Sequence, residues 1–129
     1  MLERELDINL TEPMFRGVYR ETRFHADDFQ QVMSRPQRAG VNRMIITSTH
    51  LKDCQRALGM AKDDDGLYIT LGYHPTKCSE FEKHEEGPNT YFNALKIILQ
   101  SPAAKLKVVA IGECELGPSI DIIAPFTTL

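Results

Sequence analysis

Two ionisable side chains stand at the ends of short apolar runs in this sequence. Glu113 follows the glycine that closes the run 108–111, and His74 stands at the end of the run 67–72. Runs of this length are typical of strands buried on both faces of a parallel sheet. In α/β barrels, charged side chains at the carboxyl ends of such strands usually serve chemistry. Both residues are therefore candidates for catalysis or metal binding, with a solvated loop glutamate and a structural histidine as the alternatives.

A further group of polar side chains alternates with apolar ones near the N-terminus. The segment 5–10 is predicted to be a strand, because its residues alternate with period two. The apolar face would consist of Leu6, Ile8 and Leu10, and the polar face of Glu5, Asp7 and Asn9. Three polar side chains on one face are typical of an edge strand or of a site at a strand end.

The elements that would position these residues alternate along the chain. Strands are predicted over 5–10, 43–48, 67–72 and 108–111, and helices over 25–39, 51–62 and 89–100. Thr49 is the expected N-cap of the second helix. The order β-α-β-α-β-α-β predicts an α/β fold, and right-handed crossovers would lay the strands parallel and side by side.

Arginine and aromatic side chains interleave between the first strand and the first helix. Arg16, Arg20 and Arg23 have Phe15 and Tyr19 among them. Such a pattern can contact a phosphate backbone. It is also typical of an amphipathic segment whose arginines extend their charged ends into solvent. Both interpretations stay open at the level of the sequence.

The composition bounds the class of protein. The chain has 129 residues, 42% of them hydrophobic and 26% charged, which predicts one globular domain. A formal net charge of -3 provides no general attraction to nucleic acid or to an anionic membrane. A site for a polyanion would therefore be local, built by a metal or a few basic side chains.

Cellular location is also predicted from the composition. No apolar run is long enough to cross a membrane, and the N-terminus lacks the apolar core of a signal peptide. We expect an intracellular protein, nuclear or cytoplasmic, with no membrane partner. Cys54, Cys78 and Cys114 form no CxxC pair, so free thiols are expected.

Four segments carry a family resemblance. They are 9–17 (NLTEPMFRG), 44–47 (MIIT), 72–78 (GYHPTKC) and 108–114 (VVAIGEC). In this order and spacing they resemble the TatD-type deoxyribonuclease family, most closely the N-terminal part of eukaryotic TatD DNase domain-containing proteins. The resemblance implies a metal-dependent hydrolase with a TIM-type (β/α)8 barrel that hydrolyses phosphodiester bonds of DNA.

The resemblance also implies roles for particular residues. Glu113 matches the metal-ligand glutamate between two divalent ions (Mg, Mn or Zn), and His74 matches a histidine on the substrate side of the catalytic site. Asn9 stands at a first-strand metal-ligand position, and Asp7, on the same strand face, is an alternative ligand. Such a site needs ligands that converge from several strand ends, so that one ion generates hydroxide and both hold the phosphate oxygens.

The sequence departs from the family pattern after Cys114. It continues with Glu115 and Leu116, where the family has Gly-Leu-Asp, and the later strands with their further ligands have no counterpart. A complete barrel has roughly 250 residues. We therefore expect residues 1–114 to be the first half of a barrel, about four βα units, and 115–129 to be a divergent tail.

These departures lead to two expectations about function. The first is a truncated isoform of a metal-dependent DNase that is inactive alone and retains its metals poorly. The second is a non-catalytic fragment that self-associates through exposed strand edges or pairs with the full-length enzyme. A hydrolase of the same superfamily acting on a small molecule is a further alternative.

Overall fold

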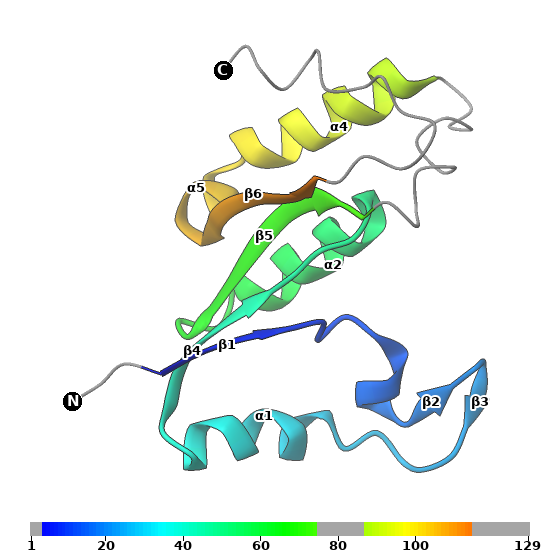
Figure 1. The fold of residues 1–129 in the computed structure, drawn as a ribbon, viewed down its shortest axis with the longest axis vertical. Helices are drawn as coiled ribbons and strands as arrows, with labels where there is room; N and C mark the ends of the chain where they lie inside the picture. The colour runs from blue at the N-terminus through cyan, green and yellow to red at the C-terminus, as the bar shows by residue number, and fades with distance from the viewer. Residues whose placement is uncertain (1–3, 75–86, 115–129) are drawn as a thin grey trace.

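A computed structural model describes residues 4–74 and 87–114 of the chain. Its main feature is a four-stranded sheet in the order β1-β4-β5-β6, in which all neighbouring strands are parallel (Figure 1). The strands are β1 (Arg4–Ile8), β4 (Val41–Ile46), β5 (Leu67–Tyr73) and β6 (Val108–Cys114). The helices are α1 (Phe29–Arg38), α2 (Leu51–Ala61), α4 (Pro88–Gln100) and α5 (Pro102–Lys107). The predicted tail 115–129 lies outside the described residues.

The sheet confirms the predicted α/β order. Successive parallel strands are joined through helices, and α1 packs against β4 while α2 packs against β5. β1 lies at one edge of the described sheet and β6 at the other. The edge position predicted for the first strand is therefore correct. That strand ends at Ile8, so Asn9 lies in the loop that follows it.

The core lies between the sheet and α2. Ile46 and Ile69 are fully buried on neighbouring strands, and Ala57 and Ala61 of α2 pack in the same cluster. A second cluster joins α2, β5 and α4 through Cys54, Leu71, Tyr91 and Leu95. The small side chains of α2 let the helix pack closely against the sheet. This packing positions the loops at both ends of the helix.

The segment between β1 and α1 forms a short 3-10 helix, η1 (Pro13–Arg16), and a hairpin of β2 (Val18–Tyr19) and β3 (Thr22–Arg23). Arg20 and Glu21 at the hairpin tip have positive φ angles of 46° and 65°. A two-residue turn with both φ angles positive usually contains Asn-Gly or Asp-Gly. The Arg-Glu pair gives no such signal, so this hairpin could not be recognised from the sequence.

The start of α2 also differs from the prediction. His50, and not Thr49, is the N-cap residue. The Thr49 hydroxyl is within 3.0 Å of both the Asp53 carboxylate and the His50 Nδ1 atom, so it is not available to cap the helix. The short helix α5 was not expected either. Its N-cap is Ser101, whose hydroxyl accepts a hydrogen bond from the Ala104 N–H.

β5 and β6 approach each other very closely at Gly72. A Cβ atom added to Gly72 would lie 2.1 Å from the carbonyl carbon of Gly112 and 2.5 Å from the backbone nitrogen of Glu113. No side chain fits in this space. Gly72 therefore sets how near the end of β6 comes to the end of β5.

Replacing Ile46 by alanine tests the core. Ile46 is fully buried, so Ile46→Ala should lower the free energy of unfolding by about 2–5 kcal/mol. Ile97 is 69% exposed on α4, so Ile97→Ala should change this free energy by less than about 0.5 kcal/mol. Urea denaturation followed by circular dichroism measures both variants. Equal stabilities would contradict the packing described here.

A pair of glycine substitutions tests the contact between β5 and β6. Gly72→Ala should destabilise the protein by about 1–3 kcal/mol or more, because the new methyl group must displace β6. Gly59 in α2 has no atom within 4 Å of an added Cβ, so Gly59→Ala should raise stability by up to about 1 kcal/mol. Thermal unfolding of the two variants should shift in opposite directions. A Gly72→Ala protein as stable as the parent would show that the backbone of β6 does not lie in close contact with this position.

Candidate active site

A cavity of about 330 Å³ opens at the carboxyl end of the sheet. Its lining is mostly polar and comes from the ends of all four parallel strands and from the loops that follow them. The lining residues are Asp7, Ile8, Asn9, Glu12, Thr47, Thr49, His74 and Glu113. Because parallel strands all end at the same edge of a sheet, side chains distant in sequence meet here. The structure thus brings the predicted site residues Asn9, His74 and Glu113 together in one cavity.

His74 and Glu113 form the central pair of this cavity. The Nε2 atom of His74 lies 3.5 Å from the Oε2 atom of Glu113, and both side chains are partly exposed. Glu113 lies within β6, one residue before its end, and not beyond the strand as its position after the glycine suggested. The pairing of Tyr73 with Cys114 continues the ladder past Gly112, which keeps Glu113 in extended backbone.

The backbone of His74 is held by the loop after β4. Its N–H donates a hydrogen bond of 2.9 Å to the carbonyl oxygen of Thr49. Thr49 is itself fixed, because Asp53 accepts hydrogen bonds from the Thr49 N–H (2.8 Å) and hydroxyl (3.0 Å). Asp53 is only 4% exposed, so its carboxylate depends on these partners. Asp53 therefore positions Thr49, and Thr49 positions His74.

Sequence reasoning missed Asp53. The available signal was its place three residues after the N-cap, where an acidic side chain often reaches back to the N–H groups at the start of a helix. In α2 the carboxylate reaches one residue further, to Thr49. Only the packing of α2 on the sheet shows that this local cap also supports the cavity.

The first strand contributes a second carboxylate. Asp7 lines the cavity, and its Oδ1 atom accepts a hydrogen bond from the Thr47 hydroxyl at the end of β4. This contact orients Asp7 toward the edge that also carries Asn9. From the sequence, Asp7 was only an alternative metal ligand. The structure places it in the same cavity as Asn9 and Glu113, the residues expected to be ligands.

The donor set fits the chemistry of a divalent cation only in part. Carboxylate and amide oxygens and an imidazole nitrogen are the groups that bind such ions. In residues 4–74 and 87–114, however, no three side chains of His, Cys, Asp or Glu are grouped closely enough to hold a metal ion. The described residues therefore do not fit a complete two-ion centre.

The two cysteines in the described part of the chain do not line this cavity. Cys54 is fully buried beneath β5, with its Sγ atom 3.7 Å from the carbonyl oxygen of Gly72. Burial raises the pKa of the Cys54 thiol, so this group stays protonated and unreactive at neutral pH. Cys54 and Cys114 are free thiols, as predicted. Cys78 lies outside the described residues, as do Pro75, Thr76 and Lys77 of the histidine motif.

None of the helices in the described part of the chain has the length and apolar character needed to cross a membrane. The predicted location of the protein, nuclear or cytoplasmic, stays a prediction.

Comparison with known proteins identifies the family. The family model described as "TatD related DNase" matches residues 18–117. The "Deoxyribonuclease Tat-D" of Schizosaccharomyces pombe is 37% identical over 109 residues, which cover 84% of this chain and 35% of that protein. The "3'-5' ssDNA/RNA exonuclease TatD" of Edwardsiella piscicida is 35% identical over 113 residues, covering 87% of this chain and 36% of that protein.

A solved structure gives the same result at the level of the fold. The hydrolase TatD family protein from Entamoeba histolytica superposes with a TM-score of 0.71 and 31% identity, over 88% of this chain and 38% of that protein. The chain thus spans little more than a third of the length of these relatives, and its four-stranded parallel sheet is part of a TIM-type barrel. From the match over residues 18–117, together with this fold, we conclude that the chain belongs to the TatD-related DNase family.

Proposed function

We propose that this chain takes part in the hydrolysis of DNA phosphodiester bonds as a portion of a TatD-type nuclease, and that its 129 residues alone do not catalyse the reaction. In this proposal Glu113 and Asn9 are metal ligands, and His74 lies on the substrate side. The observation that carries the proposal is the convergence of these residues in one polar cavity at the carboxyl edge of a parallel sheet. The names of the nuclease relatives support the reaction class.

The charge of the cavity supports a need for cations. Asp7, Glu12 and Glu113 place three carboxylates around it, and His74 is the one histidine among the residues that line it. A phosphodiester is an anion, so this cavity would repel it unless positive charge were added. Divalent ions provide that charge in metal-dependent hydrolases and also bind the phosphate oxygens.

Residues 4–74 and 87–114 hold too few of the necessary groups for a complete metal centre. An ion is held in fixed geometry by several ligands that converge on it, and no such group of three is present in the described residues. Asp7 is also engaged by the Thr47 hydroxyl, and Glu113 is paired with His74. Divalent ions should therefore bind weakly, and hydrolysis should be absent.

An assay with the purified 129-residue chain tests this proposal. With Mg²⁺ or Mn²⁺, single-stranded DNA should be cut no faster by the parent protein than by Glu113→Gln, because the ions are not fixed. Electron paramagnetic resonance titration with Mn²⁺ should show weak binding that Glu113→Gln weakens further. Metal-dependent cleavage that disappears in Glu113→Gln would refute the proposed inactivity and support the assigned role of Glu113.

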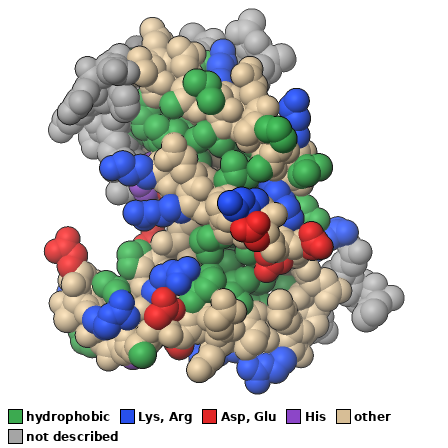
Figure 2. All heavy atoms as spheres, turned by 180° about the vertical axis from the view of Figure 1, so that it is seen from behind, with side chains coloured by type: hydrophobic (Ala, Val, Ile, Leu, Met, Phe, Trp, Pro, Cys, Tyr) green, Lys and Arg blue, Asp and Glu red, His purple; other side chains and the backbone are tan. Residues whose placement is uncertain are grey.

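The exposed edge of the sheet favours a second candidate function, that of a non-catalytic subunit. β6 is the last strand of the described sheet, and its side chains Val109 and Ile111 are 51% and 46% exposed. Hydrophobic side chains are also visible on the upper half of the molecule in Figure 2. An unpaired strand with exposed apolar side chains is a template for association. The proposed partner is a second copy of this chain or a longer relative.

Light scattering coupled to size-exclusion chromatography tests this second candidate. The parent chain should form concentration-dependent dimers or larger species. Val109→Lys should shift this equilibrium to the monomer, because it places a charge on the apolar face of β6. Ile97→Lys, at a similarly exposed position on α4, is the matched control and should leave association unchanged. A parent chain that stays monomeric at all concentrations, and that does not co-elute with a longer relative when the two are mixed, would rule out this function.

A further inference from the structure

A second hollow lies beside the hairpin of β2 and β3, with a volume of about 950 Å³. Its lining consists of Glu12, Pro13, Met14, Val18, Tyr19, Arg20, Glu21, Thr22 and Phe24. Most of the lining surface is apolar, in contrast to the polar cavity at the end of the sheet. This hollow has no part in the function proposed above.

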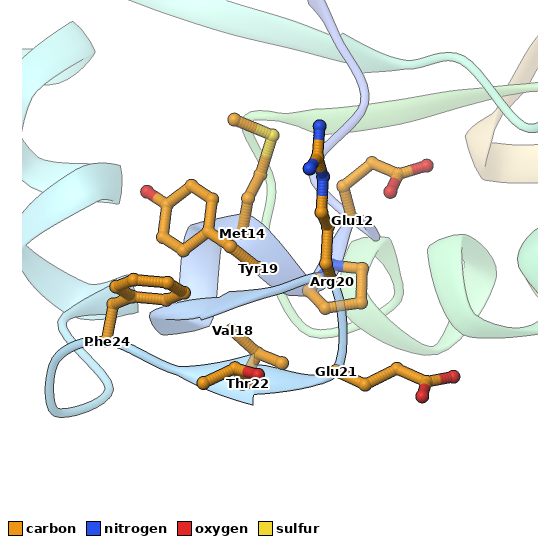
Figure 3. A pocket seen from close by; sticks show the side chains of 9 residues that line it. Glu12, Met14, Val18, Tyr19, Arg20, Glu21, Thr22 and Phe24 are labelled. Atoms are coloured by element: carbon orange, nitrogen blue, oxygen red, sulfur yellow. The ribbon is translucent and has the colours of Figure 1, made fainter.

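Two aromatic rings form one side of the hollow. Tyr19 and Phe24 meet edge to face, with ring centroids 5.6 Å apart and planes at 89°. Phe24 is 71% exposed and Tyr19 41% exposed, and the side chain of Met14, 47% exposed, lies near Tyr19 (Figure 3). Large apolar side chains gathered at the surface and bordered by charged ones indicate a binding site. A strongly exposed ring such as that of Phe24 suits a flat ligand.

One arginine at this hollow is available for a ligand. Arg16 forms an ion pair of 3.0 Å with Asp27, and Arg23 donates hydrogen bonds to the carbonyl oxygens of Arg16 and His25. Arg20, at the hairpin tip, makes no such contact in the described part of the chain. Figure 3 shows that the Arg20 and Glu21 side chains leave the tip in different directions, with Arg20 beside Glu12.

The hollow adjoins the candidate active site. Glu12 lines both the hairpin hollow and the cavity that contains His74 and Glu113. Figure 2 shows Lys and Arg side chains along the indented side of the molecule, between its upper and lower parts. A chain-like ligand that crosses the polar cavity can therefore continue over the hairpin without leaving the surface.

We propose that the hairpin hollow is a subsite for one unpaired nucleobase of a single-stranded nucleic acid, which stacks on Phe24, the more exposed of the two rings, beside Tyr19, while Arg20 binds the adjoining phosphate. The proposal rests on the nuclease function proposed above. Stacking on aromatic side chains with a nearby arginine is the general way in which proteins hold single strands. A base in a duplex has both faces covered, so this subsite selects single strands.

The test compares two oligonucleotides on the 129-residue protein. The first is a fluorescein-labelled single strand of about ten thymidines, which spans a typical single-strand site. The second has the same backbone with abasic residues. Fluorescence anisotropy without divalent ions avoids cleavage during the measurement. The parent protein should bind the abasic strand about tenfold more weakly, because it loses the stacked base.

Variants at Phe24 test whether the difference in affinity between the thymidine and abasic strands arises at the hairpin. Phe24→Ala should bind the thymidine strand about tenfold more weakly than the parent and should bind the abasic strand as the parent does. Phe24→Trp keeps a ring and should restore base-dependent binding. Ile97→Ala, which removes a similarly exposed side chain from α4, is the matched control and should behave as the parent. Circular dichroism checks that each variant is folded. Because Phe24 is exposed, its replacement should not disturb the fold.

The outcomes separate this proposal from the function on which it rests. If the parent binds both strands equally, or if Phe24→Ala weakens both equally, the base subsite is refuted while binding of the DNA backbone stands. If the parent binds neither strand, the subsite is refuted, whereas the nuclease function, in which the cavity binds phosphate only with cations, is judged by the separate assays with Mg²⁺ or Mn²⁺. If the thymidine strand does not bind at the hollow and a peptide or detergent binds there instead, the base subsite is refuted and the hollow binds a different class of ligand.

Discussion

The close approach of β5 and β6 at Gly72 is the contact on which the candidate site depends. Neither strand carries the site alone, since His74 belongs to the end of one and Glu113 to the end of the other. The two side chains come within 3.5 Å only because no side chain at position 72 separates the backbones. The close approach of β6 thus explains why glycine occupies position 72, two residues before His74.

A second constraint acts from the opposite side of His74. The buried carboxylate of Asp53 holds Thr49, and the Thr49 carbonyl holds the His74 backbone. The last of these contacts holds the backbone of His74 and not its imidazole, so it positions the loop. Because Asp53 belongs to α2, the way this helix packs on the sheet determines where Thr49 and His74 lie in the cavity. The backbone of His74 is therefore positioned by the packing of α2 on the sheet.

The cavity at the sheet edge and the hollow beside the hairpin differ in chemistry. The cavity at the sheet edge is rich in carboxylates, and it matches a phosphate only when cations are present. The hairpin offers rings and an arginine, which match a base and its phosphate without a metal. The first depends on ligands gathered from several strands, whereas the second is contained within residues 12–24. In the functions proposed above, binding of a strand and its hydrolysis therefore rest on different parts of the structure.

The order of the elements could be predicted from the sequence because each depends on local patterns. Apolar runs such as 67–71 predicted the parallel strands, and their strand-end positions made His74 and Glu113 candidate site residues. The hairpin tip could not be predicted, since Arg20 and Glu21 adopt φ angles that usually belong to glycine or asparagine. Its conformation must be supported by contacts of the surrounding residues, which a local pattern does not contain.

The amino-acid sequence by itself thus determined the α/β order and, through the resemblance, the family, and it named Asn9, His74 and Glu113 as candidate site residues. Only the tertiary structure decided that Asp7 and Glu12 join them, that Asp53 supports His74, and that Tyr19 and Phe24 stand exposed beside the same cavity. The physical reason is that strand and helix periodicity act between near neighbours in the chain. The distance between side chains on different strands is set by packing and by the space that a residue such as Gly72 leaves open.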